Sequence, residues 1–276
     1  MKNNTNMLTK LNETVAFIKA AGIENPEVGI VLGTGLGGLV NEIKVITELD
    51  YDKIPNFPVS TVESHYGKLI YGEVKGKKVL AMQGRFHFYE GYNMQEITFP
   101  IRVMKNLGIK NLLVSNAAGA LNLAYKKSTL MLITDHINMF PDNPLIGKNW
   151  DDFGPRFPDM SEAYSNKLND KLRAIAQEKN ILLNEGIYIP VMGPNLETKA
   201  EYKMLKMLGA DAVGMSTVPE VIVANHMSLP CCAISVLTDE CDPEHLEPVA
   251  IEDILAAAAI AEPQLTSLYT ELIAQL

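Results

Sequence analysis

Short apolar runs alternate with amphipathic segments along most of this chain, and that alternation limits the folds open to it. Apolar residues at helical spacing predict helices, and short apolar runs that end near glycine predict buried strands. Strands are expected at residues 28–32, 111–115, 131–134, 187–192, 212–215 and 232–237. Helices are expected at residues 8–18, 97–107, 165–178, 200–208 and 219–227, and from residue 251 onward. Strands that alternate with helices indicate an α/β fold with helices on both faces of a sheet.

Two further apolar runs, residues 69–74 and 78–82, flank Gly76 and predict a β-hairpin. The strands of a hairpin are antiparallel, so the central sheet should be mixed rather than wholly parallel. The sequence shows no linker-like low-complexity stretch and no internal repeat. We therefore expect residues 1–276 to form a single domain, a three-layer α/β/α fold around a mixed central β-sheet.

The charge and composition of the chain exclude several functional classes. A net charge of −9 and a pI near 5.1 give no general attraction for nucleic acid or an anionic membrane. Residues 1–9 lack a signal-peptide core, and no run approaches the roughly 20 apolar residues that span a bilayer. Cys231, Cys232 and Cys241 form neither a disulfide framework nor a metal-ligand pattern with histidine. We expect reduced thiols, a cytoplasmic location and no nucleic-acid or membrane partner.

One region places an acid and a hydroxyl on two loops that are separated by a short predicted helix. Glu197 follows Gly193-Pro194 on the first loop, and Ser216 precedes the helix predicted at residues 219–227. A loop carboxylate can accept from an N–H donor, and a hydroxyl at a helix start suits an anion. The two loops together predict a ligand with an N–H donor at one end and an anion at the other.

The loop Gly33-Thr-Gly-Leu-Gly-Gly38 follows a predicted strand and matches G-x-G-x-x-G. That pattern is compatible with a dinucleotide site, for which Glu48 or Asp50 lies at a tolerable distance, or with a tight turn that binds nothing. The interpretation that we favour is a single phosphate. Backbone N–H groups and the Thr34 hydroxyl would face this anion at a helix start.

Two other segments carry groups suited to an anion and a sugar. Arg85, His87 and Tyr89 alternate after the predicted strand at 78–82, so an extended backbone would point them to one side. Arg85 offers a planar fork for phosphate oxygens, and Tyr89 can cover a sugar. The strand at 111–115 runs into small residues from Asn116 onward, which let the backbone approach a ligand closely.

Taken together, these motifs resemble the trimeric class of purine nucleoside phosphorylases over residues 10–275, and the fold expected is nucleoside phosphorylase-like. The resemblance implies phosphate-dependent, reversible cleavage of purine (2′-deoxy)ribonucleosides to free base and (deoxy)ribose 1-phosphate, in purine salvage. It implies no metal and no organic cofactor, because inorganic phosphate is the co-substrate. The phosphate-binding residues implied are Thr34 (where the family usually has serine), His65, Arg85, His87, Asn116, Ala117 and Ser216.

The same resemblance implies a homotrimer in which Phe157 reaches into the neighbouring subunit's site. The nucleoside-binding residues implied within one subunit are Tyr89, Ala118, Leu196, Glu197, Met215 and Asp239. Glu197 and Asp239 would orient the purine and stabilise it as it leaves, and His87 would assist at the phosphate. These three are the implied catalytic residues.

The chain departs from the family pattern at two positions. Asp239 stands where the 6-oxopurine-specific members have asparagine, and the related methylthioadenosine phosphorylases have aspartate. An ionised aspartate can only accept, which favours a 6-amino group, whereas Glu197 fits the N1–H of guanine or hypoxanthine. The family's histidine toward the 5′-hydroxyl aligns near Ile251, and the nearest histidine, His245, is not assigned that role.

The sequence therefore predicts a purine nucleoside phosphorylase, with 6-oxopurine nucleosides favoured. One alternative is a phosphorylase that prefers 6-aminopurines, either adenosine or methylthioadenosine. A second is a nucleotide-dependent oxidoreductase built on the loop 33–38, and a third is a purine- or phosphate-binding sensor without turnover.

Overall fold

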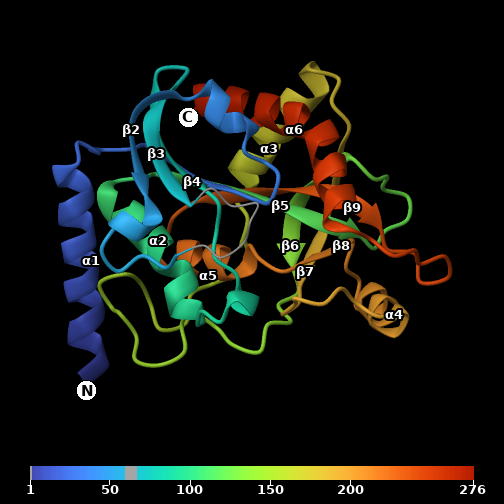
Figure 1. Ribbon diagram of the computed structural model, residues 1–276, viewed down its shortest axis with the longest axis horizontal. Coiled ribbons are helices and arrows are strands. Elements are labelled where there is room, and N and C mark those ends of the chain that lie inside the picture. The colour runs from blue at the N-terminus through green and yellow to red at the C-terminus, as the bar shows by residue number, and fades with distance from the viewer. Residues whose placement is uncertain (1, 60–66) are drawn as a thin grey trace.

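A mixed β-sheet lies between two groups of helices in the computed structural model, which describes residues 2–59 and 67–276 (Figure 1). The strands are β1 (Val28–Leu32), β2 (Lys44–Asp50), β3 (Lys68–Val74), β4 (Lys77–Gln83), β5 (Asn111–Ala120), β6 (Thr129–His136), β7 (Leu183–Pro190), β8 (Ala212–Gly214) and β9 (Cys231–Glu240). Within the described residues they form one nine-stranded sheet in the order β2-β3-β4-β1-β5-β8-β7-β6-β9. Parallel and antiparallel pairs both occur, as predicted.

Two hydrophobic clusters fix helices to opposite faces of the sheet, and a third, smaller cluster contains residues of α4 (Figure 1). The helices are α1 (Lys2–Ala20), α2 (Met94–Leu107), α3 (Asn166–Glu178), α4 (Lys199–Met207), α5 (Val218–His226) and α6 (Ile251–Ala274). One cluster joins α1, α2 and α5 to the sheet, and the other joins α3 and α6 to its second face. The three-layer α/β/α architecture predicted from the sequence is confirmed. Among the described residues, no helix combines the length and apolar character needed to cross a bilayer.

The sheet closes on itself at one side, which the sequence pattern did not predict. Strand β5 pairs with β8 and also runs parallel to β9, so β5, β8, β7, β6 and β9 form a small closed ring of strands. In this register Gly119 of β5 lies opposite Asp239 of β9. The closure therefore brings the carboxyl ends of β5 and β9 together, with β8 beside them.

The segment between β1 and β2 differs from a dinucleotide-binding unit. The predicted helix start after the glycine loop is a five-residue 3₁₀ helix, Gly38–Glu42, and β2 pairs antiparallel with β3 at the edge of the sheet. A dinucleotide-binding βαβ unit needs a crossover helix and a second strand parallel to the first. The topology therefore contradicts the oxidoreductase alternative for the loop 33–38.

Most predicted elements occur within a few residues of their expected limits. The predicted strand at 187–192 instead begins at Leu183 and ends at Pro190, because the chain then turns into the Gly193-Pro194 loop. The helix predicted at residues 165–178 is α3, which begins at Asn166 with Ser165 as its N-cap. The predicted hairpin turns at Lys75 and Gly76, both with positive φ, between β3 and β4.

Candidate active site

A cavity of about 300 Å³ opens where the carboxyl ends of β1, β5 and β9 meet the turn after β8. Of the residues predicted to bind phosphate, those that line it are Thr34, Arg85, His87, Asn116, Ala117 and Ser216. The predicted nucleoside-side residues that line it are Tyr89, Ala118, Leu196, Glu197, Met215 and Asp239. His65 lies outside the described residues. The fold therefore brings twelve of the predicted side chains to one cavity, from segments far apart in the sequence.

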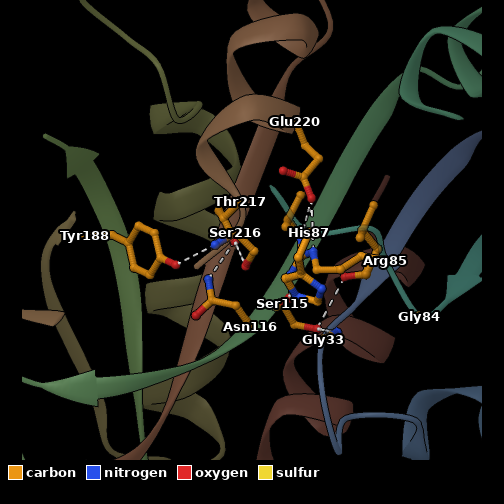
Figure 2. Close-up of polar contacts among 12 residues, drawn as sticks. Gly33, Gly84, Arg85, His87, Ser115, Asn116, Tyr188, Ser216, Thr217 and Glu220 are labelled. Atoms are coloured by element: carbon orange, nitrogen blue, oxygen red, sulfur yellow. Dashed lines mark hydrogen bonds and ion pairs between the residues drawn. The ribbon is translucent and has the colours of Figure 1, made fainter. Parts of the chain in front are cut away.

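The guanidinium of Arg85 is buried in the cavity wall and is paired with an internal carboxylate (Figure 2). Its Nε donates to Glu220 Oε1 over 3.0 Å, and Nη2 lies 2.9 Å from the same oxygen. Nη1 donates to the backbone oxygen of Ser115 over 2.6 Å. Removing one partner of such a buried pair costs about 3–5 kcal/mol, because the other charge is left unpaired. Glu220 therefore holds Arg85 in place, with the Nε–Nη2 edge turned toward the carboxylate.

The imidazole of His87 is oriented by Glu90 and by a neighbouring ring. Nδ1 lies 3.1 Å from Glu90 Oε1, which also accepts from the His87 backbone N–H over 2.8 Å. Burial lowers the pKa of His87 below its ordinary value, although the hydrogen bond with Glu90 opposes the shift. The ring is therefore neutral at pH 7, and Glu90 favours the tautomer with its proton on Nδ1.

Tyr89 reaches the cavity by a different route from the one predicted. Residues Phe88–Glu90 form a 3₁₀ helix rather than an extended segment, so the alternation expected from Arg85 to Tyr89 is broken. The Tyr89 ring instead folds back and stacks on His87, with ring centroids 4.7 Å apart and planes inclined by 13°. Both rings line the cavity, but the expectation that an extended backbone would bring them there was wrong.

The turn from β8 into α5 contains a strained residue beside the predicted hydroxyl. Thr217 has φ +74° and ψ −52°, and the Val218 N–H donates to the Ser216 oxygen over 2.8 Å. These features define a γ-turn, which is costly for a β-branched residue and persists only where surrounding contacts hold it. Asn116 Nδ2 donates to Thr217 Oγ1 over 2.9 Å, and Ser216 Oγ lies 3.2 Å from the same atom (Figure 2). The turn places the Ser216 hydroxyl at the start of α5, as predicted.

The glycine loop departs in part from its prediction. The Gly33 N–H donates to Ser115 Oγ over 3.2 Å, and the Gly38 N–H donates to the Glu262 carboxylate of α6. These two backbone groups are thus used inside the protein, and the short 3₁₀ helix supplies little dipole for an anion. A Cβ at Gly33 would lie 2.8 Å from the Asn116 Cα, so glycine allows the loop to lie against β5. Thr34 lines the cavity.

Glu197 is positioned by the start of α4. Thr198 is the N-cap: its Oγ1 accepts from the Glu201 N–H over 3.3 Å, and Glu201 Oε2 accepts from the Thr198 N–H over 2.7 Å. This capping box fixes the backbone immediately after Glu197. Burial raises the pKa of the Glu197 carboxyl, and the nearby Asp239 charge adds to the rise. Hydrogen bonds from the Glu197 backbone and from the Tyr202 hydroxyl oppose it.

Both oxygens of the Asp239 carboxylate already accept hydrogen bonds. Thr238 Oγ1 donates to Oδ1 over 3.0 Å, and the Cys241 thiol donates to Oδ2 over 3.2 Å. Asp239 and Cys241 both line the cavity. A carboxylate held by two donors presents its remaining lone pairs to a ligand as an acceptor.

The remaining predicted positions lie as follows. Ile251 and Ile254, in the first turn of α6, line the cavity where the family pattern has a histidine near the 5′-hydroxyl. His245 lies outside the cavity lining and pairs with Asp242, whose Oδ2 is 2.8 Å from its Nδ1. Phe157 is 86% exposed and lines a separate surface hollow.

Neither the cysteines nor any cluster of potential metal ligands forms a second site among the described residues. Cys231, Cys232 and Cys241 are free and buried, in agreement with the expectation of reduced thiols. Over residues 2–59 and 67–276, no group of three or more His, Cys, Asp or Glu side chains could hold a metal ion.

Known proteins share both the sequence and the fold of this chain. A family model for the phosphorylase superfamily matches residues 27–274. Purine nucleoside phosphorylase 1 of Bacillus subtilis is 46% identical over 269 residues, which are 98% of this chain and 99% of that protein. The chain belongs to the purine nucleoside phosphorylase family.

Two solved structures of Schistosoma mansoni purine nucleoside phosphorylases are similar over nearly the whole chain. Isoform 2, in complex with cytosine and ribose-1-phosphate, has a TM-score of 0.92 and 43% identity, and the match covers 97% of this chain and 96% of that chain. A second structure, in complex with adenosine, has a TM-score of 0.91 and 40% identity over 96% of both chains. The predicted resemblance and the nucleoside phosphorylase-like fold are confirmed.

Sequence reasoning assigned no role to several residues that build this purine nucleoside phosphorylase site. Glu220 and Glu90 hold Arg85 and His87, and Tyr188 accepts from the Ser216 N–H over 3.3 Å. Glu220 carried a signal, because a charged residue in the otherwise apolar helix after Pro219 predicts a buried partner. Tyr202 and Cys241 carried no such signal, since their contacts depend on closure of the sheet.

Proposed function

We propose that this protein catalyses reversible, phosphate-dependent cleavage of the N-glycosidic bond of purine (2′-deoxy)ribonucleosides. The products are free purine base and (deoxy)ribose 1-phosphate, and the role is purine salvage. The observation that carries the proposal is the single cavity of about 300 Å³, lined by both the phosphate-side and the nucleoside-side residues. Its size and its mixture of apolar surface with a few polar groups are typical of a small-molecule site. Membership of the family supports the same reaction.

The interactions within the cavity lining suggest two working parts. We call Arg85, His87, Asn116 and Ser216 the Arg85 wall, and Glu197, Asp239, Tyr202 and Cys241 the Glu197 wall. The proposed phosphate lies at the Arg85 wall, where Thr34 and Ala117 also contribute. The purine lies at the Glu197 wall, with Leu196 and Ala118 beside it and with Met215 and Tyr89 near the sugar.

The proposed chemistry needs no protein nucleophile. Cleavage of the glycosidic bond builds positive charge on the sugar, as in glycoside hydrolysis, and negative charge on the departing purine. Phosphate held below the anomeric carbon stabilises the cation and then attacks it. Neutral His87, with its proton on Nδ1, can accept at Nε2 from a phosphate hydroxyl and so orient the nucleophile. Positioning and preorganised electrostatics supply the rate.

At the other wall, Glu197 accepts from the purine N1–H, which favours inosine and guanosine. A second candidate activity, on adenosine or methylthioadenosine, is supported by one observation: Asp239 is held as an acceptor by Thr238 and Cys241. An acceptor suits the 6-amino group of adenine. The proposed ligands are therefore a purine nucleoside and inorganic phosphate as co-substrate, without a metal or organic cofactor.

The exposed ring of Phe157 supports a homotrimer in which this residue completes a neighbouring subunit's cavity. Phe157 is 86% exposed, and the Arg156 guanidinium lies 5.8 Å from its ring centroid. A large exposed aromatic side chain is typical of a contact surface. The free buried thiols support a cytoplasmic location. The cavity draws on residues from Gly33 to Ile254, which supports one domain over residues 1–276.

Base release from inosine, guanosine and adenosine, each measured with and without phosphate, tests the proposed function. We expect phosphate-dependent release with stoichiometric ribose 1-phosphate. Release that does not require phosphate would indicate a hydrolase. Binding of bases without any turnover would indicate the sensor alternative.

A further inference from the structure

The glycine loop is held to the rest of the protein by a hydrogen bond at each of its ends. At its start, the Gly33 N–H donates to Ser115 Oγ of β5 over 3.2 Å. At its end, the Gly38 N–H donates to the carboxylate of Glu262 in α6, which is 224 residues away in sequence. Thr34, which lines the cavity, lies between these two hydrogen bonds. The position of the Thr34 hydroxyl therefore depends on both of them.

One face of α6 packs directly against the glycine loop. Leu255, Ala258 and Glu262 recur at intervals of three and four residues, so they lie on the same side of the helix. A Cβ at Gly35, whose φ is +71°, would lie 3.1 Å from Leu255 Cδ2 and 3.3 Å from Ala258 Cβ. A Cβ at Gly38 would lie 2.7 Å from Glu262 Cδ. The two glycines therefore allow the loop to lie on α6, with the Glu262 carboxylate against its last residue.

Few side chains hold the glycine loop in place. Leu36 is buried in the core, but four of the six loop residues are glycine and have no side chain to pack. A hollow of about 450 Å³ also borders the loop, and Gln83, Gly84 and Glu262 contribute to its lining. Gly33 lines both this hollow and the cavity, so the loop separates two open spaces. Because glycine backbone is conformationally free, the hydrogen bonds at the two ends determine where the loop lies.

We propose that Glu262 is a positioning residue for phosphate: its carboxylate holds the glycine loop against α6 through the Gly38 N–H and so keeps the Thr34 hydroxyl at the phosphate. The proposal rests on the proposed function, because that function places phosphate beside Thr34. Glu262 is not among the described residues that line the cavity. It therefore acts through the loop and not by contact with a substrate.

The charge of Glu262 and its position have opposite effects on phosphate. A carboxylate repels a phosphate dianion through space, so a role through charge alone would make phosphate bind more tightly once the charge is removed. If Glu262 acts by position, Glu262→Ala should instead weaken phosphate binding. Glu262→Gln removes the charge but keeps an oxygen that accepts from the Gly38 N–H, so it should leave the loop in place. The two variants therefore separate position from charge.

The test is steady-state phosphorolysis of inosine by the full-length protein, with phosphate and inosine varied separately. Glu262→Ala should raise the KM for phosphate about tenfold, which corresponds to the loss of one hydrogen bond to a charged group. Its KM for inosine should change by less than about twofold, because the residues proposed to bind the purine lie on other segments. Glu262→Gln should keep a KM for phosphate within about twofold of the wild type.

A substitution on the loop side of the contact gives an independent test. Gly38 is not among the glycines with positive φ, so its backbone accepts alanine, but the new Cβ would displace the Glu262 carboxyl. Gly38→Ala should therefore raise the KM for phosphate about as much as Glu262→Ala does. The double variant should be no worse than Glu262→Ala alone, because the collision is then absent. Glu271→Ala is the matched control, since Glu271 of α6 pairs with Lys179 over 3.9 Å at the surface, and it should leave phosphate kinetics unchanged.

Several results would overturn the role of Glu262. An unchanged KM for phosphate in Glu262→Ala would show that the loop does not need this contact, and a lower KM in both Glu262→Ala and Glu262→Gln would show an effect of charge alone. An equal rise in both KM values, or a Glu262→Gln protein that behaves like Glu262→Ala, would also contradict it. Each leaves the proposed function intact if the wild type cleaves inosine with phosphate. Absence of phosphate-dependent cleavage of any purine nucleoside by the wild type would overturn the proposed function itself.

Discussion

The Arg85 wall and the Glu197 wall of the cavity are built on different physical plans. In the Arg85 wall, the key side chains are buried and each has an acidic partner: Arg85 pairs with Glu220, and the neutral His87 ring lies against Glu90. In the Glu197 wall, the acid lies half-buried on a loop, and the charges that raise the pKa of its carboxyl, after burial, are those of Asp239 and Glu201. The first plan gives a rigid site that can serve every substrate alike. The Glu197 wall has no paired charge of this kind, and we expect single substitutions there to change which purine is preferred.

The largest effect should come from breaking the pair in the Arg85 wall. Arg85→Ala leaves Glu220 buried without its partner, and we expect a loss of about 3–5 kcal/mol in the free energy of unfolding, measured with urea. Where the variant stays folded, its KM for phosphate should rise and its turnover fall, with a loss of about 1.5–3 kcal/mol for a charge-assisted contact. Unchanged phosphate kinetics would show that Arg85 only stabilises the fold.

A surface arginine provides the matched control for Arg85. Arg173 pairs with Glu185 and Asp170 over 2.7 and 2.6 Å, but all three side chains are substantially exposed. Arg173→Ala should therefore cost no more than about 1 kcal/mol. A similar loss in both variants would remove the distinction between a buried, preorganised pair and an exposed one.

The Glu197 wall should respond in activity rather than in stability. Glu197→Ala should lower kcat/KM for inosine and guanosine by about 100-fold, because the acceptor for the purine N1–H is lost. The melting temperature and circular dichroism spectrum should stay close to those of the wild type, since the side chain lies on a loop. Glu48→Ala provides the control. Glu48 is an exposed acid on the edge strand β2, and it pairs with Lys68 of β3. A collapsed fold in Glu197→Ala would favour a structural role for this residue.

A smaller and more selective change is expected at Asp239. Asp239→Asn introduces an amide that donates to a 6-oxo group, so activity on adenosine should fall relative to inosine. We expect a change of about tenfold in the ratio of specificity constants, which is about 1.4 kcal/mol. An unchanged ratio from pH 6 to 9 would mean that Asp239 does not contact position 6 of the purine.

The smallest effect should be a pH dependence of stability at His87. The folded protein lowers the pKa of this histidine, whereas the unfolded chain titrates near the ordinary value of about 6.5. As the pH falls through that value, the unfolded chain binds a proton that the folded protein does not, so stability decreases by at most about 1.4 kcal/mol per pH unit. His87→Asn should therefore lose less stability than the wild type between pH 7 and 5. Parallel stability curves would show that His87 is not held neutral.

The sequence predicted the two walls unequally. Glycine and small residues after apolar runs located Gly33 and Asn116 at strand ends, and the fold brings both to the cavity. These predictions depend only on the residues within one segment and not on its contacts with the rest of the fold. The role of Glu220 could be inferred only in part, because its partner Arg85 is 135 residues away in sequence.

Two residues of the Glu197 wall could not be found from the sequence. Tyr202 and Cys241 come together because β5 pairs with β9 and because β8 lies beside them, and local periodicity does not report such closure. The prediction for Tyr89 failed in its reason because residues Phe88–Glu90 form a 3₁₀ helix rather than an extended segment, and the ring stacks on His87. Local patterns located the side chains, and tertiary packing determined how they meet.

Phosphate binding tests most directly whether the two walls work as separate units. Phosphate should be titrated into the wild type and into Glu197→Ala by calorimetry, with hypoxanthine as the second ligand. We predict that both proteins bind phosphate with dissociation constants that agree within about twofold, while hypoxanthine affinity falls by about 100-fold in Glu197→Ala. A phosphate affinity that falls about tenfold or more in Glu197→Ala, or a wild type that binds no phosphate, would contradict the account.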